Sequence, residues 1–404
     1  MKKTITAAFV ISILITAGSC QKNEIESLEK NILFTLSIGK SEDELPLFHN
    51  PGESIPAANV AMANGLLFVS SSQGGKIMKF NSYGDILGLF YNPETNPEPV
   101  LLSTNLDQEE ISTRRAFPYQ FREVENIAVS KDLTLLVQDE IAEERQEFDE
   151  ELNAMLDQIV LRFGKDGEFI DYLGQEGSGG TPFPYIERLQ VTARGDPVIV
   201  SRTQKNWIVF WYNEFGYLKY KLKVDLNALP EIEDEQAVPS MGTIIADRRE
   251  SLLYIKIDYY ASQAEEFAEN PSGIQYTGGF IHIFDLEKEK FVGEIEIPRH
   301  YRSQTSMDVL SFEKEQMLYE FIGVSEGGYL FFLSPSEGNY YELMILAAGG
   351  KVIKRVNFTL LDAETILRDF YVSPEGIVTA LICNETAAEV VWWRTDKYIE
   401  WENE

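Results

Sequence analysis

The sequence predicts an all-β fold, a six-bladed β-propeller with four-stranded antiparallel blades. One phrase recurs along the chain: a short apolar strand, a turn, a strongly apolar strand, a third strand, a glycine turn and a fourth strand. Turns of the Asn-Gly, Asp-Gly and Gly-Gly kind separate these strands, as antiparallel hairpins require. Radially stacked repeats of such a meander form a propeller.

The first copy shows the phrase most clearly. Its second strand is nearly all apolar, which is typical of a strand buried on both faces, and its third strand is less uniform, as expected for partial exposure. Its four strands are predicted at residues 60–65, 67–70, 76–81 and 86–90.

Five further copies follow, and the last one is a strand short. An isolated apolar segment, residues 31–39, precedes the first copy. We predict that this segment completes the last blade and closes the ring, because closure removes open strand edges; the alternative is an N-terminal strand outside the ring. The later copies have their first strands at residues 127–129, 189–191, 243–246, 321–324 and 370–372.

Four insertions interrupt the repeat, and insertions on one rim of a propeller often build a binding face. The acidic insert, residues 140–158, has apolar residues at helical spacing and is predicted to form a solvated helix. Oxygen ligation of Ca²⁺ by its carboxylates is the less favoured alternative. The apolar positions are Ile141, Phe148, Leu152, Met155 and Leu156, and the other insertions are residues 92–120, 262–276 and 303–316.

Composition excludes several classes of protein. The 404 residues are 44% hydrophobic, enough for a large core, and carry a formal net charge of −30, which disfavours nucleic acid as a partner. Two cysteines exclude a disulfide scaffold, and three dispersed histidines make a histidine-rich metal centre improbable. Cys383 lies in an apolar segment and is predicted to be a buried, inert thiol.

The N-terminus predicts export. Lys2 and Lys3 precede an apolar run over residues 5–17. These 13 residues are too few for a membrane-spanning helix, which needs about 20. We therefore predict a signal peptide over residues 1–19.

Cys20 is predicted to carry a lipid. The small residues before it, Ala17-Gly18-Ser19, resemble a bacterial lipobox, although Ala17 stands where leucine is usual, a departure tolerated in spirochaetal lipoproteins. The resemblance implies cleavage before Cys20 and diacylglycerol on its thiol; the alternative is an ordinary secretory signal. Residues 20–30 then form a polar tether of at most roughly 36 Å. It would join a single domain, residues 31–404, to a membrane of the bacterial envelope, with the outer membrane favoured.

The repeat resembles NHL-type propeller repeats, in which an acidic-glycine turn separates two apolar strands. Residues 173–180, rich in glycine, resemble the linker between blades of that family. Residues 34–39 and 42–48 also resemble the opening of an uncharacterised family of spirochaetal propeller lipoproteins. The resemblance implies a propeller and is nearly silent on chemistry.

No catalytic or cofactor motif is present. The chain has no P-loop, His-Glu-x-x-His or EF-hand loop, and we expect no cofactor. Gly323-Val324-Ser325-Glu326-Gly327 matches the letters Gly-x-Ser-x-Gly, but it falls in a predicted turn between two strands and not at the strand-to-helix elbow that this nucleophile motif requires. We predict a protein-binding or scaffold module whose partner is another envelope protein. The alternative is a hydrolase or lyase acting on a saccharide or small ester in the central cavity through a pair of carboxylates.

One constellation of polar residues follows from the architecture. Innermost strands line the central channel, so the residues that begin them ring its mouth on one face. We favour water-filled channel lining with internal ion pairs over a ligand site, and we expect each arginine in the ring to pair with an acid. The ring consists of Asn59, Glu125, Asn126, Glu187, Arg188, Thr243, Glu320, Arg368 and Asp369.

Overall fold

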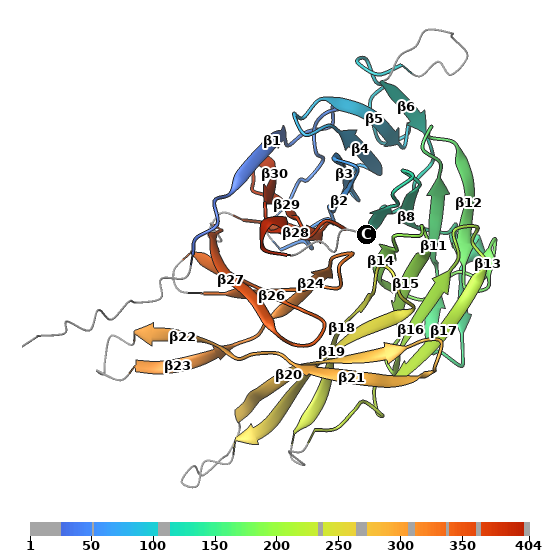
Figure 1. Cartoon of the computed structure of the whole chain (residues 1–404). Helices are drawn as coiled ribbons and strands as arrows, with labels where there is room; N and C mark the ends of the chain where they lie inside the picture. Colours follow the sequence, from blue (N-terminus) through green and yellow to red (C-terminus); the bar gives the residue numbers. More distant parts are fainter. Residues whose placement is uncertain are drawn as a thin grey trace, which may run out of the picture.

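The fold is a six-bladed, all-β propeller. The computed structural model describes residues 26–50, 52–103, 114–232, 237–263, 273–305, 312–336, 339–360 and 365–399. Six sheets, antiparallel except for one additional parallel strand in the first, surround a central axis. Figure 1 views the ring along that axis, with the chain passing from blade to blade in sequence order. The prediction of six four-stranded blades is confirmed.

Each of the first three blades is a meander that runs outward from the central axis, and two of them carry an additional strand. Blade 1 is β2 (Val60–Ala63), β3 (Leu66–Ser71), β4 (Lys76–Phe80), β5 (Ile86–Tyr91) and the additional β6 (Arg115–Pro118). Blade 2 is β7 (Ile127–Val129), β8 (Leu135–Glu140), β11 (Gln158–Phe163), β12 (Phe169–Gly174) and the additional β13 (Gly177–Ser178). Blade 3 is β14 (Ile186–Val191), β15 (Pro197–Arg202), β16 (Asn206–Tyr212) and β17 (Leu218–Asp225).

The remaining blades follow the same plan, and the last one takes its outer strand from the N-terminus. Blade 4 is β18 (Val238–Ala246), β19 (Leu252–Gln263), β20 (Gly273–Asp285) and β21 (Lys290–Glu296). Blade 5 is β24 (Glu320–Val324), β25 (Leu330–Pro335), β26 (Tyr340–Leu346) and β27 (Val352–Thr359). Blade 6 is β28 (Leu367–Val372), β29 (Val378–Cys383), β30 (Ala387–Trp393) and β1 (Asn31–Ser37), and a short 3₁₀ helix, η3 (Asp396–Tyr398), follows β30.

Strand β1 closes the ring, as predicted. It pairs antiparallel with β30, and a bulge between Ile32 and Phe34 shifts the register. Leu36 is buried in a core cluster shared by blades 6 and 1, and the rings of Phe34 and Phe80 lie 5.0 Å apart. The strand therefore completes one sheet and also packs against the next.

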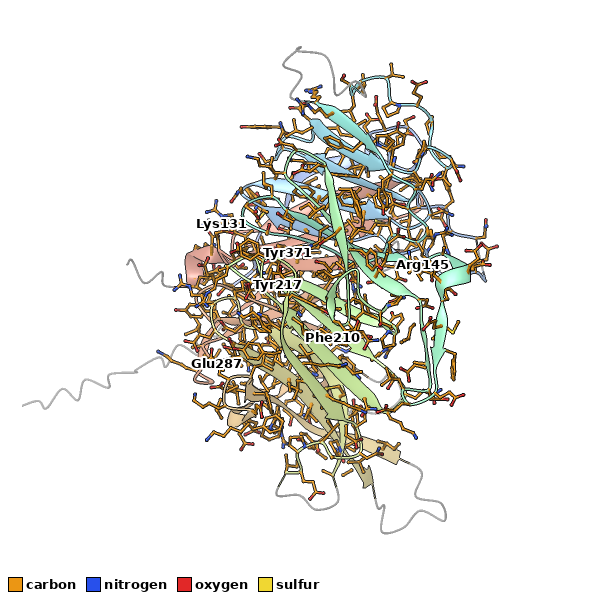
Figure 2. All side chains as sticks on the ribbon, turned by 90° about the vertical axis from the view of Figure 1, so that its right-hand side faces the viewer. Lys131, Arg145, Phe210, Tyr217, Glu287 and Tyr371 are labelled. Carbon is orange, nitrogen blue, oxygen red and sulfur yellow. The ribbon has the colours of Figure 1, made fainter. Side chains whose placement is uncertain are left out.

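The meander gives the ring two different faces. We call the face where the innermost strands begin the N-side face, and the face where they end the C-side face. Turns between strands one and two, and between strands three and four, lie on the C-side face; the second-to-third turns and the links between blades lie on the N-side face. Figure 2 shows the ring from its edge, with Lys131, Tyr217 and Glu287 toward one face and Arg145 toward the other.

All four insertions leave the ring on its N-side face, because each joins a second to a third strand or one blade to the next. Their described parts contain strands, turns and one 3₁₀ turn. In the insertion at 92–120, β6 pairs parallel to β5, and β19 and β20 extend their ladder as far as Gln263 and Gly273. Between blades 4 and 5, β22 (His300–Thr305) and β23 (Phe312–Met317) form a separate hairpin.

The helix predicted for the acidic insert is wrong. The segment forms one 3₁₀ turn, η1 (Glu143–Arg145), and a hairpin of β9 (Glu147–Asp149) and β10 (Ala154–Leu156). The Asp149 carboxylate accepts the backbone N–H of Leu152 at 2.8 Å, which stabilises the turn of the hairpin. Phe148 and Met155 face each other across the two strands. A spacing of seven residues therefore reflects a cross-strand pair and not a helical stripe.

Removing residues 143–154 should leave the propeller intact. The base of the insert belongs to the blade, because Ile141 and Leu156 are buried and Gln158 pairs with Glu140 in the β8–β11 ladder. A replacement of all of 140–158 would cut into that ladder. We expect a short Gly-Ser turn in place of 143–154 to change the free energy of unfolding by less than about 1 kcal/mol, measured by chemical denaturation. A loss of cooperative unfolding would contradict this prediction.

The tether predicted over residues 20–30 contacts the propeller from Glu26 onward. The Leu28 N–H donates to the carbonyl of Asn357 in β27, and Leu28 is buried. The Glu26 carboxylate lies 2.6 Å from Lys354 Nζ and accepts the hydroxyl of Tyr398. Lys354 lies in the half of β27 nearest the C-side face, and Tyr398 follows β30 on that face. The described chain therefore begins at the outer rim of blade 5, toward the C-side face.

Candidate functional site

The predicted ring residues lie at the beginnings of the innermost strands, on the N-side face, except Thr243, which lies inside β18 beyond a bulge. Arg188 lies in β14, and its side chain lines the central cavity. The electrostatic neighbours of Arg188 are Glu320 of β24, Asp369 of β28 and the adjacent Glu187. Blade geometry thus brings together residues as far apart in sequence as Glu187 and Asp369, which are 182 positions apart.

Arg188 has no acid close enough for an ion pair, which corrects the expected pairing. Among the described residues no carboxylate oxygen lies within 4.0 Å of its guanidinium, and its Nε has no hydrogen-bond partner. Burial lowers the pKa of Arg188, while Glu320, Asp369 and Glu187 act in the opposite direction. The three carboxylates therefore attract the Arg188 guanidinium across distances longer than an ion pair. Arg188 is partly exposed to water in the channel.

Asp369 is the most perturbed acid of this cluster. Its Oδ2 accepts the Val60 N–H at 2.7 Å, which joins the innermost strands of blades 6 and 1. Burial raises the pKa of Asp369 to about 7, although the Val60 hydrogen bond and Arg188 favour the charged form. Its neighbour in sequence, Arg368, is exposed and donates to the hydroxyl of Tyr341, with the guanidinium 4.8 Å from the ring centre.

Blade 2 places its ring residues in a network that sequence reasoning missed. The Gln138 amide donates to Glu125 and to Gln158 Oε1, the latter at 3.0 Å, and Asn126 Nδ2 donates to Gln138 Oε1 at 2.6 Å. Gln158 Oε1 also accepts the N–H of Ile186 at 2.5 Å, which links blade 2 to blade 3. These contacts join two blades. The sequence could not predict them, because each buried glutamine shows only as one polar residue in an apolar strand.

Glu187 belongs to the Arg188 cluster and also pairs with a residue outside it, whereas the remaining ring residues are not part of one site. Glu187 lies 2.9 Å from Arg202 Nε, and Asn59 Oδ1 is buried without a hydrogen-bond partner. Thr243 follows a bulge in β18 and is partly exposed. The structure therefore brings Glu187, Arg188, Glu320 and Asp369 together and distributes the rest of the ring among separate local contacts.

The central cavity is small. Its volume is about 80 Å³, and it is lined by the innermost strands of blades 2 to 6. Pockets that enclose organic ligands measure roughly 300–1,000 Å³. A cavity of this size holds a few water molecules.

Arg248 closes the channel toward the C-side face, and it was not predicted. It follows β18, and its Nε and Nη2 donate to the carbonyls of Val324 at 2.7 Å and Val372 at 2.6 Å. Its guanidinium lies 5.9 Å from the ring centre of Tyr371, and its own carbonyl accepts the N–H of Ala193. One residue thus joins blades 3, 4, 5 and 6.

An acidic cluster lies beside the channel mouth on blade 2. Burial raises the pKa of Asp139 to about 6. Burial, with the nearby charges of Glu123 and Asp157, raises the pKa of Glu140 to about 7. Together with Asp369, these groups bind protons in the folded state at pH values where the unfolded chain has lost them.

We expect the propeller to lose stability between pH 5 and pH 8. An acid whose folded-state pKa lies above its unfolded value near 4 stabilises the fold at low pH, and this contribution disappears as the pH rises through 6 to 7. The variant Glu140→Gln should therefore stabilise the protein at pH 8 by about 1 kcal/mol, after allowance for solvent screening, and have little effect at pH 5. Thermal melts across this range test the prediction; an equal effect of the variant at both pH values would contradict it.

No metal site is evident in the described part of the chain, where no three His, Cys, Asp or Glu side chains are grouped to hold an ion. Cys383 is buried, and burial raises its pKa to about 12, with a further contribution from Asp369. Among the described helices none is long and apolar enough to cross a bilayer.

Comparison with known proteins finds only distant structural similarity. No known protein family and no curated protein matches the sequence. Solved structures similar to this chain include the Dos1 propeller, with 8% identity over 91% of this chain and 95% of that chain and a TM-score of 0.38. Another is the β-propeller domain of the Trilobed protease from Pyrococcus furiosus, with 12% identity over 84% and 93% and a TM-score of 0.38.

A third similar structure is that of a polysaccharide lyase, an ulvan lyase, with 12% identity over 90% of this chain and 83% of that chain and a TM-score of 0.40. Similarity at this level carries no argument about activity. The chain is a six-bladed β-propeller with structural neighbours among propeller proteins.

Proposed function

We propose that this protein is a lipid-anchored β-propeller of the bacterial cell envelope that binds another protein through its N-side face. The observation that carries the proposal is the placement of all four insertions on that one face. The small central cavity supports binding outside the channel, because about 80 Å³ does not accommodate a saccharide or ester substrate.

The chemistry of the N-side face suits a protein partner. Exposed apolar side chains lie there among carboxylates, and apolar anchors within a polar surround are typical of protein interfaces. Tyr185 lies at the start of blade 3, with the Arg202 guanidinium 4.9 Å from its ring centre. The acidic insert adds charge that favours a basic partner surface. The exposed apolar residues of this face include Phe148, Met155, Tyr185, Val238 and Ile274.

The lipid anchor follows from the signal peptide and from Cys20. The resemblance of the repeat to NHL-type propellers, and of the N-terminal segment to spirochaetal propeller lipoproteins, is consistent with an anchored envelope protein. The described chain begins at Glu26, only six residues after Cys20. A propeller tethered in this way would stay close to the membrane and meet partners that share its compartment.

The anchor is tested with Cys20→Ser. We expect this variant to leave the membrane fraction, because its only proposed lipid attachment is lost. Fractionation of cells with a high-salt wash, followed by immunoblotting, measures the change. A variant that still sediments with membranes would show that Cys20 does not anchor the protein.

Partner binding is tested by photo-crosslinking in intact cells. A crosslinking residue at Tyr185, on the N-side face, should give a discrete protein adduct. The matched control is Phe291 on the outer strand β21, because the two side chains are 46% and 45% exposed. Adducts of equal yield from both positions, or none from Tyr185, would contradict binding through the N-side face.

A further inference from the structure

A pocket lies between blades 1 and 2, close to the C-side face. Its volume is about 320 Å³, and pockets that enclose organic ligands measure roughly 300–1,000 Å³. Residues 164–166, in a turn of the C-side face, form one of its walls. The lining combines aliphatic side chains with aromatic rings, cations and one acid, Asp166. The aromatic and cationic residues are Phe68, Lys79, Phe90, Arg115, Phe117 and Lys165.

Lys79 places an ammonium group in this pocket without a polar partner. Within the described part of the chain, Lys79 Nζ forms no hydrogen bond or ion pair, and it lies 5.8 Å from the centre of the Phe68 ring. Burial lowers the pKa of Lys79, while the charge of Asp166 acts in the opposite direction. A partly buried cation of this kind attracts an anion more strongly than a fully solvated one does.

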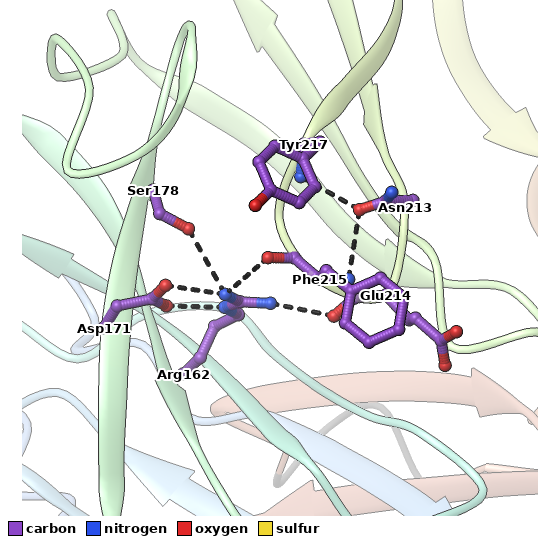
Figure 3. Close-up of polar contacts among 7 residues, drawn as sticks. All are labelled: Arg162, Asp171, Ser178, Asn213, Glu214, Phe215 and Tyr217. Atoms are coloured by element: carbon purple, nitrogen blue, oxygen red, sulfur yellow. Dashed lines mark hydrogen bonds and ion pairs between the residues drawn. The ribbon is translucent and has the colours of Figure 1, made fainter.

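Blade 2 contains the same position with its polar partners in place. Lys79 and Arg162 each precede a bulge in the third strand of their blade. Arg162 pairs across the sheet with Asp171, whose carboxylate accepts two hydrogen bonds of 2.6 Å from the guanidinium. Figure 3 shows that the guanidinium also reaches the carbonyls of Glu214 and Phe215 in the turn of the next blade.

Blade 1 lacks the corresponding acid. Lys79 pairs across the sheet with Gly88, at the position that Asp171 occupies in blade 2. A side chain at Gly88 would meet no atom closer than Lys79 Cβ at 3.5 Å, and the φ of Gly88 is not in the left-handed region. Neither packing nor backbone conformation therefore requires glycine here. Its effect is to leave open, beside Lys79, the space that a carboxylate fills in blade 2.

The apolar part of the pocket includes a strained residue. Leu133 has a φ of +69°, in the left-handed region, and lies in the turn between the first two strands of blade 2. The same position in blades 3, 5 and 6 holds Gly195, Gly328 and Gly376. Leu133 lines the pocket and packs against the core shared by blades 1 and 2. Strain of this kind clusters at ligand sites.

The charge close to the pocket favours an anion. Three cations and one acid line it, and one further acid, Glu168, lies beside it. Within the described chain, Arg115 and Lys165 form no ion pair or hydrogen bond. Asp85, on the neighbouring turn of blade 1, is engaged by Arg114 at 3.8 Å. The cations of the pocket therefore outnumber its acids, although the chain as a whole is acidic.

We propose that this pocket binds a small carboxylate with an apolar body. The ligand carboxylate takes beside Lys79 the place that Asp171 takes beside Arg162, and the apolar body contacts the aromatic and aliphatic lining. The pocket lies away from the N-side face, so the site depends neither on the proposed protein partner nor on the lipid anchor.

Phenylacetate is the probe, and phenylacetamide, which has nearly the same shape without the charge, is the control ligand. Binding of each to the purified protein is measured by ligand-detected NMR and calorimetric titration. We expect phenylacetate to bind at least about tenfold more tightly than phenylacetamide, because a hydrogen bond between charged groups contributes at least this factor.

Gly88→Asp tests the site itself, because it gives Lys79 the internal carboxylate that blade 2 already has. We expect Gly88→Asp and Lys79→Met to bind phenylacetate at least about tenfold more weakly than the wild type, and the matched control Gly88→Ala to stay within about threefold. Circular dichroism establishes that each variant is folded, and Lys79→Met alone decides the test if Gly88→Asp does not fold. Three results would overturn the proposal: no binding of phenylacetate by the wild type, equal affinity for phenylacetamide, or unchanged affinity in either folded variant.

Discussion

Removing residues 31–37 should abolish cooperative folding of the propeller. These residues form β1, the outer strand of blade 6, and its loss would leave β30 as an open edge and expose the cluster shared with blade 1. The loss of the ladder hydrogen bonds and of the apolar area that Leu36 and Phe34 bury together exceeds about 5 kcal/mol, which is comparable to the total stability of many proteins. Chemical denaturation followed by circular dichroism measures the effect.

Two point variants in β1 test whether its packing, and not merely the length of the chain, stabilises the ring. Leu36 is 4% exposed and Ile32 is 49% exposed on the same strand. We expect Leu36→Ala to lower the free energy of unfolding by about 3 kcal/mol and Ile32→Ala by less than about 1 kcal/mol. An unchanged denaturation midpoint after removal of residues 31–37 would show that the ring does not depend on β1.

Arg248→Met should destabilise the ring by about 3 kcal/mol. The substitution keeps much of the apolar stem and removes two charged hydrogen bonds, each of which contributes roughly 1.5–3 kcal/mol. The carbonyls of Val324 and Val372 would lose their donor in a cavity with room for few water molecules. Because those carbonyls belong to blades 5 and 6, the loss should weaken the contacts among blades 4, 5 and 6.

The adjacent arginine provides the control. Arg249 lies on the surface and contacts Glu326 at 3.3 Å, so Arg249→Met should cost less than about 1 kcal/mol. Arg248→Lys should behave like Arg248→Met, because one ammonium group does not reproduce the guanidinium fork that reaches both carbonyls. Equal denaturation midpoints for the Arg248 and Arg249 variants would show that the hydrogen bonds of Arg248 do not stabilise the contacts between blades.

Sequence reasoning placed the mouth of the channel and failed on its contacts. Aligning the repeats put Arg188, Glu320 and Asp369 at the start of three innermost strands, and the structure brings these three together. Arg188 forms no ion pair with any described residue, because the channel separates its guanidinium from the nearby carboxylates by more than 4.0 Å. Side-chain separations of a few ångströms depend on blade tilt and bulges, which no repeat alignment contains.

Arg248 and Arg162 illustrate a different limit. Each donates to backbone carbonyls of other blades, and a carbonyl has no sequence signature. Nothing near Arg248 in the sequence distinguishes it from its neighbour Arg249, although one closes the channel and the other lies on the surface.

The sequence by itself determined the number of blades, the order of their strands and the closure by β1. These features follow from local chemistry: glycine turns define hairpins, and alternation of apolar residues defines the buried faces. Only the tertiary structure decided the conformation of the acidic insert. The spacing of Phe148 and Met155 fits a helix as well as a hairpin, but in the structure the insert forms a hairpin in which they face each other. Ile141 and Leu156, at the base of the insert, are buried. The tertiary structure also decided which polar side chains meet in the channel, because those contacts join residues that are distant in sequence and depend on how six blades pack around one axis.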